Sequence, residues 1–283
     1  MTDPVEGSRS REARHQLPQG LGQLFSDGGT GRVLDVDLPP GRLVVPHEET
    51  AAARPAYWLS DEPGGGDLWA QLRKAHGWSG LWPVLVSPHD GNLKVPWVAG
   101  EVSPEPVGRI DGLHAAEVLA DFWNEWVEDG SDLRELEPFG HGWPGLAQAT
   151  DGGQEPDEFA DQFVRDHEDG TSRIMLVPAA RSADVITSVG WQGPLNFSND
   201  MAPLSSVLRS WEDRFGVRLV ELGLDTLALT VAAPPVTTEH AEHVAAEHFA
   251  FCPDNVVQGQ APTIREYAAR MVQGKTIWSF WWD

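Results

Sequence analysis

The last eight residues of the chain, TIWSFWWD, constrain its fold more than any other stretch. In a β-strand, successive side chains point to opposite faces. One face of residues 276–283 therefore carries Trp278, Phe280 and Trp282, and the other carries Ile277, Ser279 and Trp281. A strand that is apolar on both faces is typical of the interior of a sheet covered on each side. We therefore predict an interior strand at the C-terminus and take it as the core of a domain.

The apolar pattern elsewhere predicts a protein of class α/β (α+β), with a mixed, mostly antiparallel sheet flanked by helices. Further strands are predicted at residues 32–38, 42–46, 81–86, 93–98, 173–177, 217–222 and 226–232. Short turns between residues 81–86 and 93–98, and between residues 217–222 and 226–232, predict two hairpins. Apolar stripes with helical spacing predict helices that begin near Asp67, Asp111, Ser182, Ala202, Thr238 and Thr263.

The length of 283 residues is enough for two lobes, each with its own core. We expect a disordered or loosely packed leader at residues 1–30 and an N-terminal α/β lobe at residues 31–130. An acidic connector rich in Gly and Pro follows at residues 131–170, and a C-terminal domain occupies residues 171–283.

The two predicted lobes share a pattern of strand, helix, hairpin and helix. Leu68 and Leu72, followed by residues 81–86, match Leu204 and Leu208, followed by residues 217–222, at one constant offset. Because the identities are few, the pattern fits coincidence as well as duplication.

The charge of the chain excludes several classes of function. The sequence has 43 acidic and 20 basic residues, a formal net charge of -23. Such a chain repels nucleic acid and anionic lipid, and it attracts a basic protein or a cationic ligand. No apolar run is long enough for a membrane span or a secretory signal. The single cysteine, Cys252, fits a reducing compartment, so we expect a cytoplasmic protein.

Three strings in the second half resemble a known family. They are AEHFAFCPDN at residues 246–255, the stretch from Ser210 to Leu222, and the closing WSFWWD at residues 278–283. They are similar to a bacterial, mainly actinobacterial, family known as the domain of unknown function DUF4253, over roughly residue 173 to the end. The resemblance implies a domain boundary, and it implies no activity, cofactor or catalytic residue.

His248, Cys252 and Asp254 form the first candidate site, a thiol nucleophile with a histidine base. A reactive thiolate needs a helix N-terminus or nearby cations, whereas Cys252 follows the C-terminal end of a predicted helix, where the dipole raises the thiol pKa. We therefore favour the alternative that Cys252 is a small buried residue and His248 a core or capping histidine.

His240, His243 and Glu247 share one flank of a predicted helix and form a candidate metal site, since two imidazoles and a carboxylate can bind Zn²⁺. The segment lacks the His-Glu-x-x-His order of a metalloprotease helix, and alternating Glu and His are more typical of a solvated face. We predict no metal here.

Two loops form the third candidate site, for a ligand or a partner. Trp191 and Asn196 lie in one loop, and Asp254 and Asn255 lie in another. Exposed aromatic side chains beside small polar groups suit binding. The alternative, a loop attached to the core through its aromatic residue, is the more common arrangement.

The sequence has no phosphate-binding glycine loop, cysteine pair or nucleophile elbow, so we predict no cofactor. Two classes of function remain open. The first is a non-enzymatic protein- or ligand-binding module, for which an immunity-like role is an analogy only. The second is a small-molecule enzyme centred on His248, Asp254 and the Trp191 loop.

Overall fold

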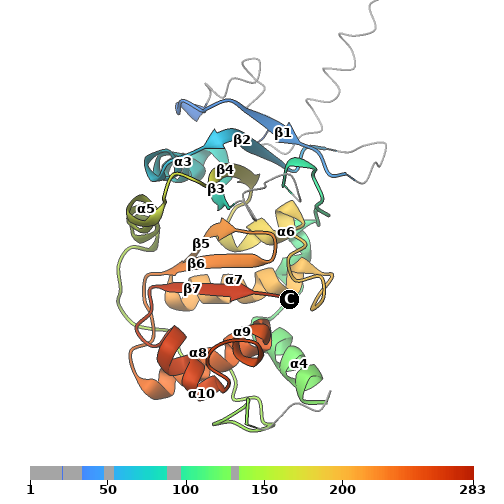
Figure 1. The fold of residues 1–283 in the computed structure, drawn as a ribbon, viewed down its shortest axis with the longest axis vertical. Coiled ribbons are helices and arrows are strands. Elements are labelled where there is room, and N and C mark those ends of the chain that lie inside the picture. Colours follow the sequence, from blue (N-terminus) through green and yellow to red (C-terminus); the bar gives the residue numbers. More distant parts are fainter. Residues whose placement is uncertain (1–20, 22–33, 48–53, 88–96, 129–133) are drawn as a thin grey trace, which may run out of the picture.

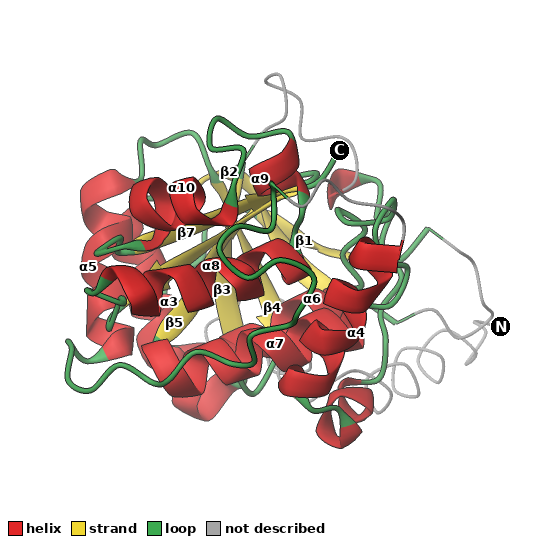
Figure 2. Cartoon of the chain, turned by 90° about the horizontal axis from the view of Figure 1, so that it is seen from below, coloured by secondary structure: helices red, strands yellow, loops and turns green. Residues whose placement is uncertain are grey.

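The computed structural model describes residues 21, 34–47, 54–87, 97–128 and 134–283. These residues form a mixed α+β fold in which a mostly antiparallel sheet is flanked by helices, so the predicted fold class is confirmed (Figure 2). Most of the predicted leader, residues 1–30, lies outside the described residues.

The described residues form one seven-stranded sheet with the order β1-β2-β4-β3-β5-β6-β7. Neighbouring strands are antiparallel except β3 and β5, which are parallel. In Figure 1 the strands follow one another from β1 at the top to β7 in the lower half. Their bounds are β1 Gly41–Val44, β2 Tyr57–Pro63, β3 Leu81–Val86, β4 Arg173–Pro178, β5 Val217–Leu222, β6 Thr226–Val231 and β7 Ile277–Trp281.

The predicted helices begin close to the positions expected from the sequence, whereas α5 and α9 were not predicted. They are α3 Gly66–Ser79, α4 Ala115–Glu128, α5 Pro156–His167, α6 Val185–Val189, α7 Met201–Phe215, α8 Thr238–Phe251, α9 Asp254–Val257 and α10 Ile264–Tyr267. Short helical turns lie at Val107–Gly112, Ser182–Asp184 and Ala268–Val272. The side chains of Asp200, Thr237 and Thr263 each accept a hydrogen bond from the first turn of the helix that follows.

The alternation of side chains along the strands separates two apolar cores, one on each face of the sheet. The smaller core contains Trp69 of α3, Val164 of α5 and Val220 of β5. The larger core contains side chains of α4, α6, α7 and α8, such as Trp211 and Phe249. In the described part of the chain, every helix is too short or too polar to cross a membrane.

The C-terminal strand, β7, is an edge strand, so the prediction of an interior strand is wrong. Trp278, Phe280 and Trp282 are buried in the larger core, with exposed fractions of 1 %, 1 % and 2 %. The opposite face is only partly covered, and Ser279 on that face is exposed. The apolar residues on both faces predicted an interior strand, but Ile277 and Trp281 are only partly covered. An edge strand tolerates such partial exposure of apolar side chains.

One predicted strand and one predicted strand pairing are corrected. Residues 34–38 are not a strand, because Asp35 has a φ of 51°, a left-handed conformation that interrupts extended backbone. The predicted hairpin of residues 81–86 and 93–98 does not form, because β4 and β5 occupy the two sides of β3. Residues 93–96 themselves lie outside the described residues.

The sheet runs through both predicted lobes, because β4 pairs with β2 on one side and β3 on the other. The predicted connector contains α5, which packs against α3. The two segments that matched at a constant offset are neighbours at the centre of the sheet. Leu85 pairs with Glu221 and Val86 with Leu222, which are the equivalent positions of the sequence match. The lobe boundaries and the duplication remain predictions.

Candidate functional site

His248 and Cys252, the first candidate pair, lie at the end of α8, inside the larger core. His248 has an exposed fraction of 0 % and is surrounded by Trp211, Trp278 and Phe280. Its Nδ1 lies 3.3 Å from the hydroxyl of Tyr267. The Cys252 thiol donates to the backbone oxygen of Trp281 at 3.0 Å, so it does not contact the imidazole as a nucleophile contacts its base.

The ionisation of both groups is opposed by burial. Desolvation, with a smaller contribution from the nearby charge of Arg214, lowers the pKa of His248 to about 3. Burial raises the pKa of the Cys252 thiol well above its ordinary value. A neutral imidazole and a protonated thiol agree with the structural roles favoured above.

The candidate metal ligands are not brought together. His240 Nε2 contacts the backbone oxygen of Gln148 at 2.7 Å, and His243 Nδ1 contacts that of Glu239 at 2.9 Å. Glu247 points into the core, where it accepts hydrogen bonds from Arg214, Trp211 Nε1 and the Ala147 amide. Among the described residues no group of three His, Cys, Asp or Glu side chains could hold a metal.

The loop residues of the third candidate site contact the core and the C-terminal residue of the chain. The side chain of Trp191 is buried and donates to the Gly223 oxygen, so it lies in the core and not on an exposed surface. The amide nitrogen of Asn196 donates to the Asp283 oxygen at 2.7 Å. A carboxylate oxygen of Asp254 accepts the Asp283 amide at 3.1 Å.

Asn255 binds the open edge of β7 as a neighbouring strand would. Its Nδ2 donates to the Ser279 oxygen at 2.8 Å, and its Oδ1 accepts from the Trp281 amide at 3.1 Å. Cys252 completes this contact through its bond to the Trp281 oxygen. Asn255 is therefore occupied by backbone groups of the protein itself.

A cavity of about 460 Å³ between α4 and α7 presents a different chemistry. We call it the arginine cavity, because Arg181, Arg209 and Arg214 line it together with Asp111 and Asp213. Ala115 and Ala116, the first residues of α4, also line it, and a helix N-terminus favours negative charge. Three guanidinium groups in one cavity are notable in a chain with a net charge of -23.

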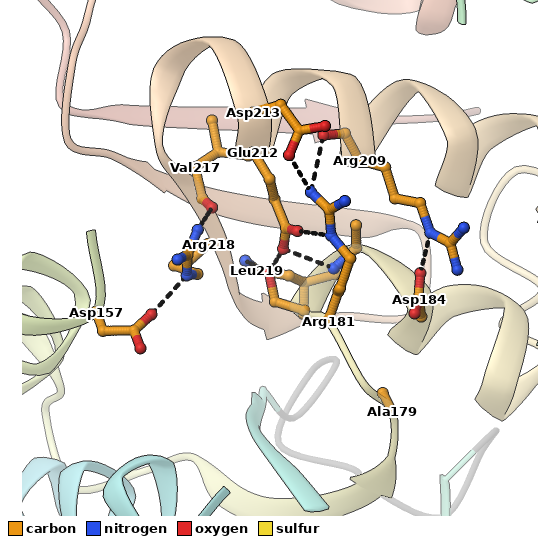
Figure 3. Close-up of polar contacts among 12 residues, drawn as sticks. Asp157, Ala179, Arg181, Asp184, Arg209, Glu212, Asp213, Val217, Arg218 and Leu219 are labelled. Atoms are coloured by element: carbon orange, nitrogen blue, oxygen red, sulfur yellow. Dashed lines mark hydrogen bonds and ion pairs between the residues drawn. The ribbon is translucent and has the colours of Figure 1, made fainter. Parts of the chain in front are cut away.

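Buried carboxylates bind these guanidinium groups, and Figure 3 shows the contacts of Arg181 and Arg209. Arg209 Nε donates to Asp184, whose side chain is 1 % exposed. Arg181 Nε donates to Glu212, 6 % exposed, at 2.6 Å. Arg214 forms a bidentate pair with the fully buried Glu247. Each arginine is thereby fixed in direction before any ligand arrives.

Two of the arginines keep donors free. Within the described residues, Arg209 donates through Nε and Nη1 and Arg181 through Nε and Nη2, so Arg209 Nη2 and Arg181 Nη1 donate to no protein acceptor. Hydrogen bonding to Asp184 raises the pKa of Arg209. Burial lowers the pKa of Arg181, but the carboxylates of Glu212 and Asp213 outweigh this and raise it overall. Both groups are therefore fully charged, with N–H groups available to an acceptor.

A second cavity, of about 280 Å³, adjoins the first at Arg181 and Asp213. Arg218, Asp157 and Glu212 also line it. Arg218 Nε donates to Asp157 at 2.6 Å, and Asp157 also contacts Arg73. Because carboxylates outnumber arginines around this second cavity, it suits an anion less well than the arginine cavity.

Sequence reasoning missed the arginine cavity. Arg209 and its partner Asp111 are 98 residues apart, and Arg181 and Glu212 are 31 residues apart. No local motif joins such residues. The available signal was the cluster of Arg209, Arg214 and Arg218 within one short segment of an acidic chain.

The comparisons with known proteins concern the segment that contains these arginines. Residues 173–283 match the family described as a domain of unknown function, DUF4253. This confirms the resemblance at the level of the family model. The matched segment supplies Arg181, Arg209 and Arg214, whereas the preceding chain supplies Asp111 and the start of α4. The searches of curated proteins and of solved structures gave no match for this chain.

Proposed function

We propose that this protein is a non-enzymatic binding module that holds a small organic anion in the arginine cavity. One observation carries the proposal: Arg181 and Arg209 are each fixed at Nε by a buried carboxylate, and each presents free N–H donors. Oriented guanidinium groups match carboxylate and phosphate oxygens and bind them by charge-assisted hydrogen bonds.

A binding role is supported by two hydroxyl groups at the arginine cavity, which already take part in hydrogen bonds within the protein. The hydroxyl of Ser206 at the arginine cavity donates to the Pro203 oxygen, and the hydroxyl of Ser210 accepts from Arg214. His248 and Cys252 are buried away from the cavity. We place the protein in the cytoplasm, where the one thiol of the sequence stays reduced.

The test is calorimetry with acetate, phosphate and citrate at low ionic strength. Arg209→Gln removes the free donors, and we expect affinity to fall by at least about tenfold, the effect of losing a hydrogen bond to a charged group. Arg265→Gln is the matched control, because Arg265 is 57 % exposed and pairs with Glu242 on α8. The proposal is wrong if none of the three anions binds, or if both variants bind like the wild type.

The net charge of -23 supports a second candidate, capture of a basic protein or cationic ligand. Electrostatic attraction would accelerate association with a native partner, and added salt would slow it. An association rate that does not change with salt would exclude this candidate.

A further inference from the structure

Two guanidinium groups of the arginine cavity carry the same arrangement of carboxylates. Arg209 contacts Asp184 through Nε and Asp111 through Nη1, the latter at 2.8 Å. Arg181 contacts Glu212 through Nε and Asp213 through Nη2, the latter at 2.6 Å. Each arginine therefore has one carboxylate at Nε, which we call the inner carboxylate, and another at a terminal Nη, which we call the outer carboxylate.

The two members of each arrangement differ sharply in burial. The inner carboxylates, Asp184 and Glu212, are 1 % and 6 % exposed. The outer ones, Asp111 and Asp213, are 70 % and 68 % exposed. An exposed ion pair is screened by water and contributes little, so it is easily exchanged. A buried pair is costly to break, because the remaining charge is left without a partner.

The outer carboxylates also line the cavity itself, as do both arginines. Next to the free Arg209 Nη2 and Arg181 Nη1 groups, Asp111 and Asp213 thus occupy one donor on each guanidinium. Their side chains show which acceptor geometry these donors accommodate, since a carboxylate of the protein is already bound there.

We propose that the ligand of the arginine cavity is a small organic dicarboxylate. One of its carboxylates replaces Asp111 on Arg209, and the other replaces Asp213 on Arg181. The inference rests on the proposed anion-binding function and narrows it to one chemical class. Both carboxylates of such a ligand are ionised at neutral pH, so each can take the place of an aspartate at a guanidinium, and the displaced Asp111 and Asp213 keep their charges in the surrounding water.

The rest of the lining suits the body of such a molecule. Ile110, Leu113 and Leu146 contribute apolar surface between the charged groups. A short aliphatic linker buried there tightens binding about fourfold for each methylene group. The free N–H groups of Arg209 and Arg181 supply further bonds to each carboxylate.

A ligand series tests the class. Calorimetry at low ionic strength compares acetate, phosphate, succinate, glutarate and adipate on the full chain. We expect one dicarboxylate to bind at least about tenfold more tightly than acetate, because its second carboxylate gains a further charge-assisted bond. The inference is overturned if acetate or phosphate binds as tightly as every dicarboxylate.

Matched variants test the mode of binding. Asp111→Asn and Asp213→Asn weaken an internal competitor, and we expect tighter dicarboxylate binding. Asp184→Asn and Glu212→Gln loosen the arginines, and we expect weaker binding. All four changes preserve the size of the side chain, and thermal melting reports whether the buried variants are folded. Opposite effects at one guanidinium are not expected of a purely structural ion pair.

The outcomes separate this inference from the proposed function. If anions bind and Arg209→Gln abolishes binding, but dicarboxylates have no advantage, the anion-binding function stands and the dicarboxylate class is wrong. If Asp111→Asn and Asp213→Asn both weaken binding, displacement is wrong. If no anion binds at all, both conclusions fail together.

Discussion

Arg214 of α7 and Glu247 of α8 form a bidentate ion pair, with Nη1 to Oε1 at 2.7 Å and Nη2 to Oε2 at 2.6 Å. The Glu247 side chain is fully buried, and the Arg214 side chain is 14 % exposed. Glu247 also accepts from Trp211 Nε1 and the Ala147 amide. This one carboxylate therefore joins two helices and the segment before α5.

Breaking this pair should strongly destabilise the fold. We expect Glu247→Leu to lower the free energy of unfolding by about 3–5 kcal/mol, because a buried guanidinium is left without its partner. Urea denaturation measures the loss. Glu242→Leu, which breaks the more exposed pair with Arg265, is the control and should cost no more than about 1 kcal/mol. Equal losses in the two variants would contradict this account.

The imidazole of His248 should make stability fall in mild acid. Its pKa is about 3 in the folded state, below the ordinary value of 6.5, so the unfolded chain binds its proton first. The contribution of the neutral imidazole to the free energy of unfolding is fully present above pH 6.5. It is lost as the pH falls toward 3, by up to about 1.4 kcal/mol per pH unit.

Urea denaturation between pH 7 and pH 4.5 shows whether the free energy of unfolding falls as the pH is lowered. His248→Phe should reduce the dependence on pH, since phenylalanine suits the aromatic surroundings and does not titrate. His141→Gln, at an exposed position, is the control for the removal of a histidine. If the free energy of unfolding of His248→Phe depends on pH as strongly as that of the wild type, the carboxylates and not His248 cause the loss of stability in acid.

Cys252 should react with thiol reagents only when the protein opens. Its side chain is buried, and burial raises its thiol pKa, so little thiolate exists in the folded state at neutral pH. We expect labelling by a disulfide reagent to be far slower than that of free cysteine, and to accelerate in urea. Labelling in buffer at the rate of free cysteine would restore Cys252 as a candidate nucleophile.

The two faces of β7 should respond differently to truncation. We expect Trp278→Ala to lower the free energy of unfolding by about 3–5 kcal/mol, because it opens a cavity in the larger core. Trp281→Ala, on the partly covered face, should cost less than half as much. Chemical denaturation of both variants decides the point, and similar losses would favour the interior position that the sequence predicted.

Local patterns were enough to predict the hairpin of β5 and β6, helix α7 and helix α8. Each depends on neighbours in the chain, such as the stripe of Leu204, Leu208 and Trp211. The insertion of β4 between β2 and β3 was not predictable in this way, because it depends on pairing with distant segments. Residues 93–98 are largely apolar and follow β3 closely in the chain, so the sequence predicted them as its partner. In the sheet the neighbours of β3 are β4 and β5.

For the candidate sites too, the sequence indicated only residues that are close together in the chain. Reactive residue types close together in sequence, such as His248 and Cys252, drew attention, although packing makes them inert. The arginine cavity is assembled from α7, the segment after β4 and the segment before α4. Its carboxylate partners become visible only when side chains distant in sequence are placed in space.

The contact between Asn255 and β7 also determines how the sheet stops. An unpaired edge strand is a template for aggregation, because its free N–H and C=O groups recruit strands from other molecules. One asparagine, one thiol and the carboxylate of Asp254 occupy these groups at the C-terminal end of β7. Three side chains thereby cover backbone groups that would otherwise be open to another molecule, a form of protection that requires no additional strand.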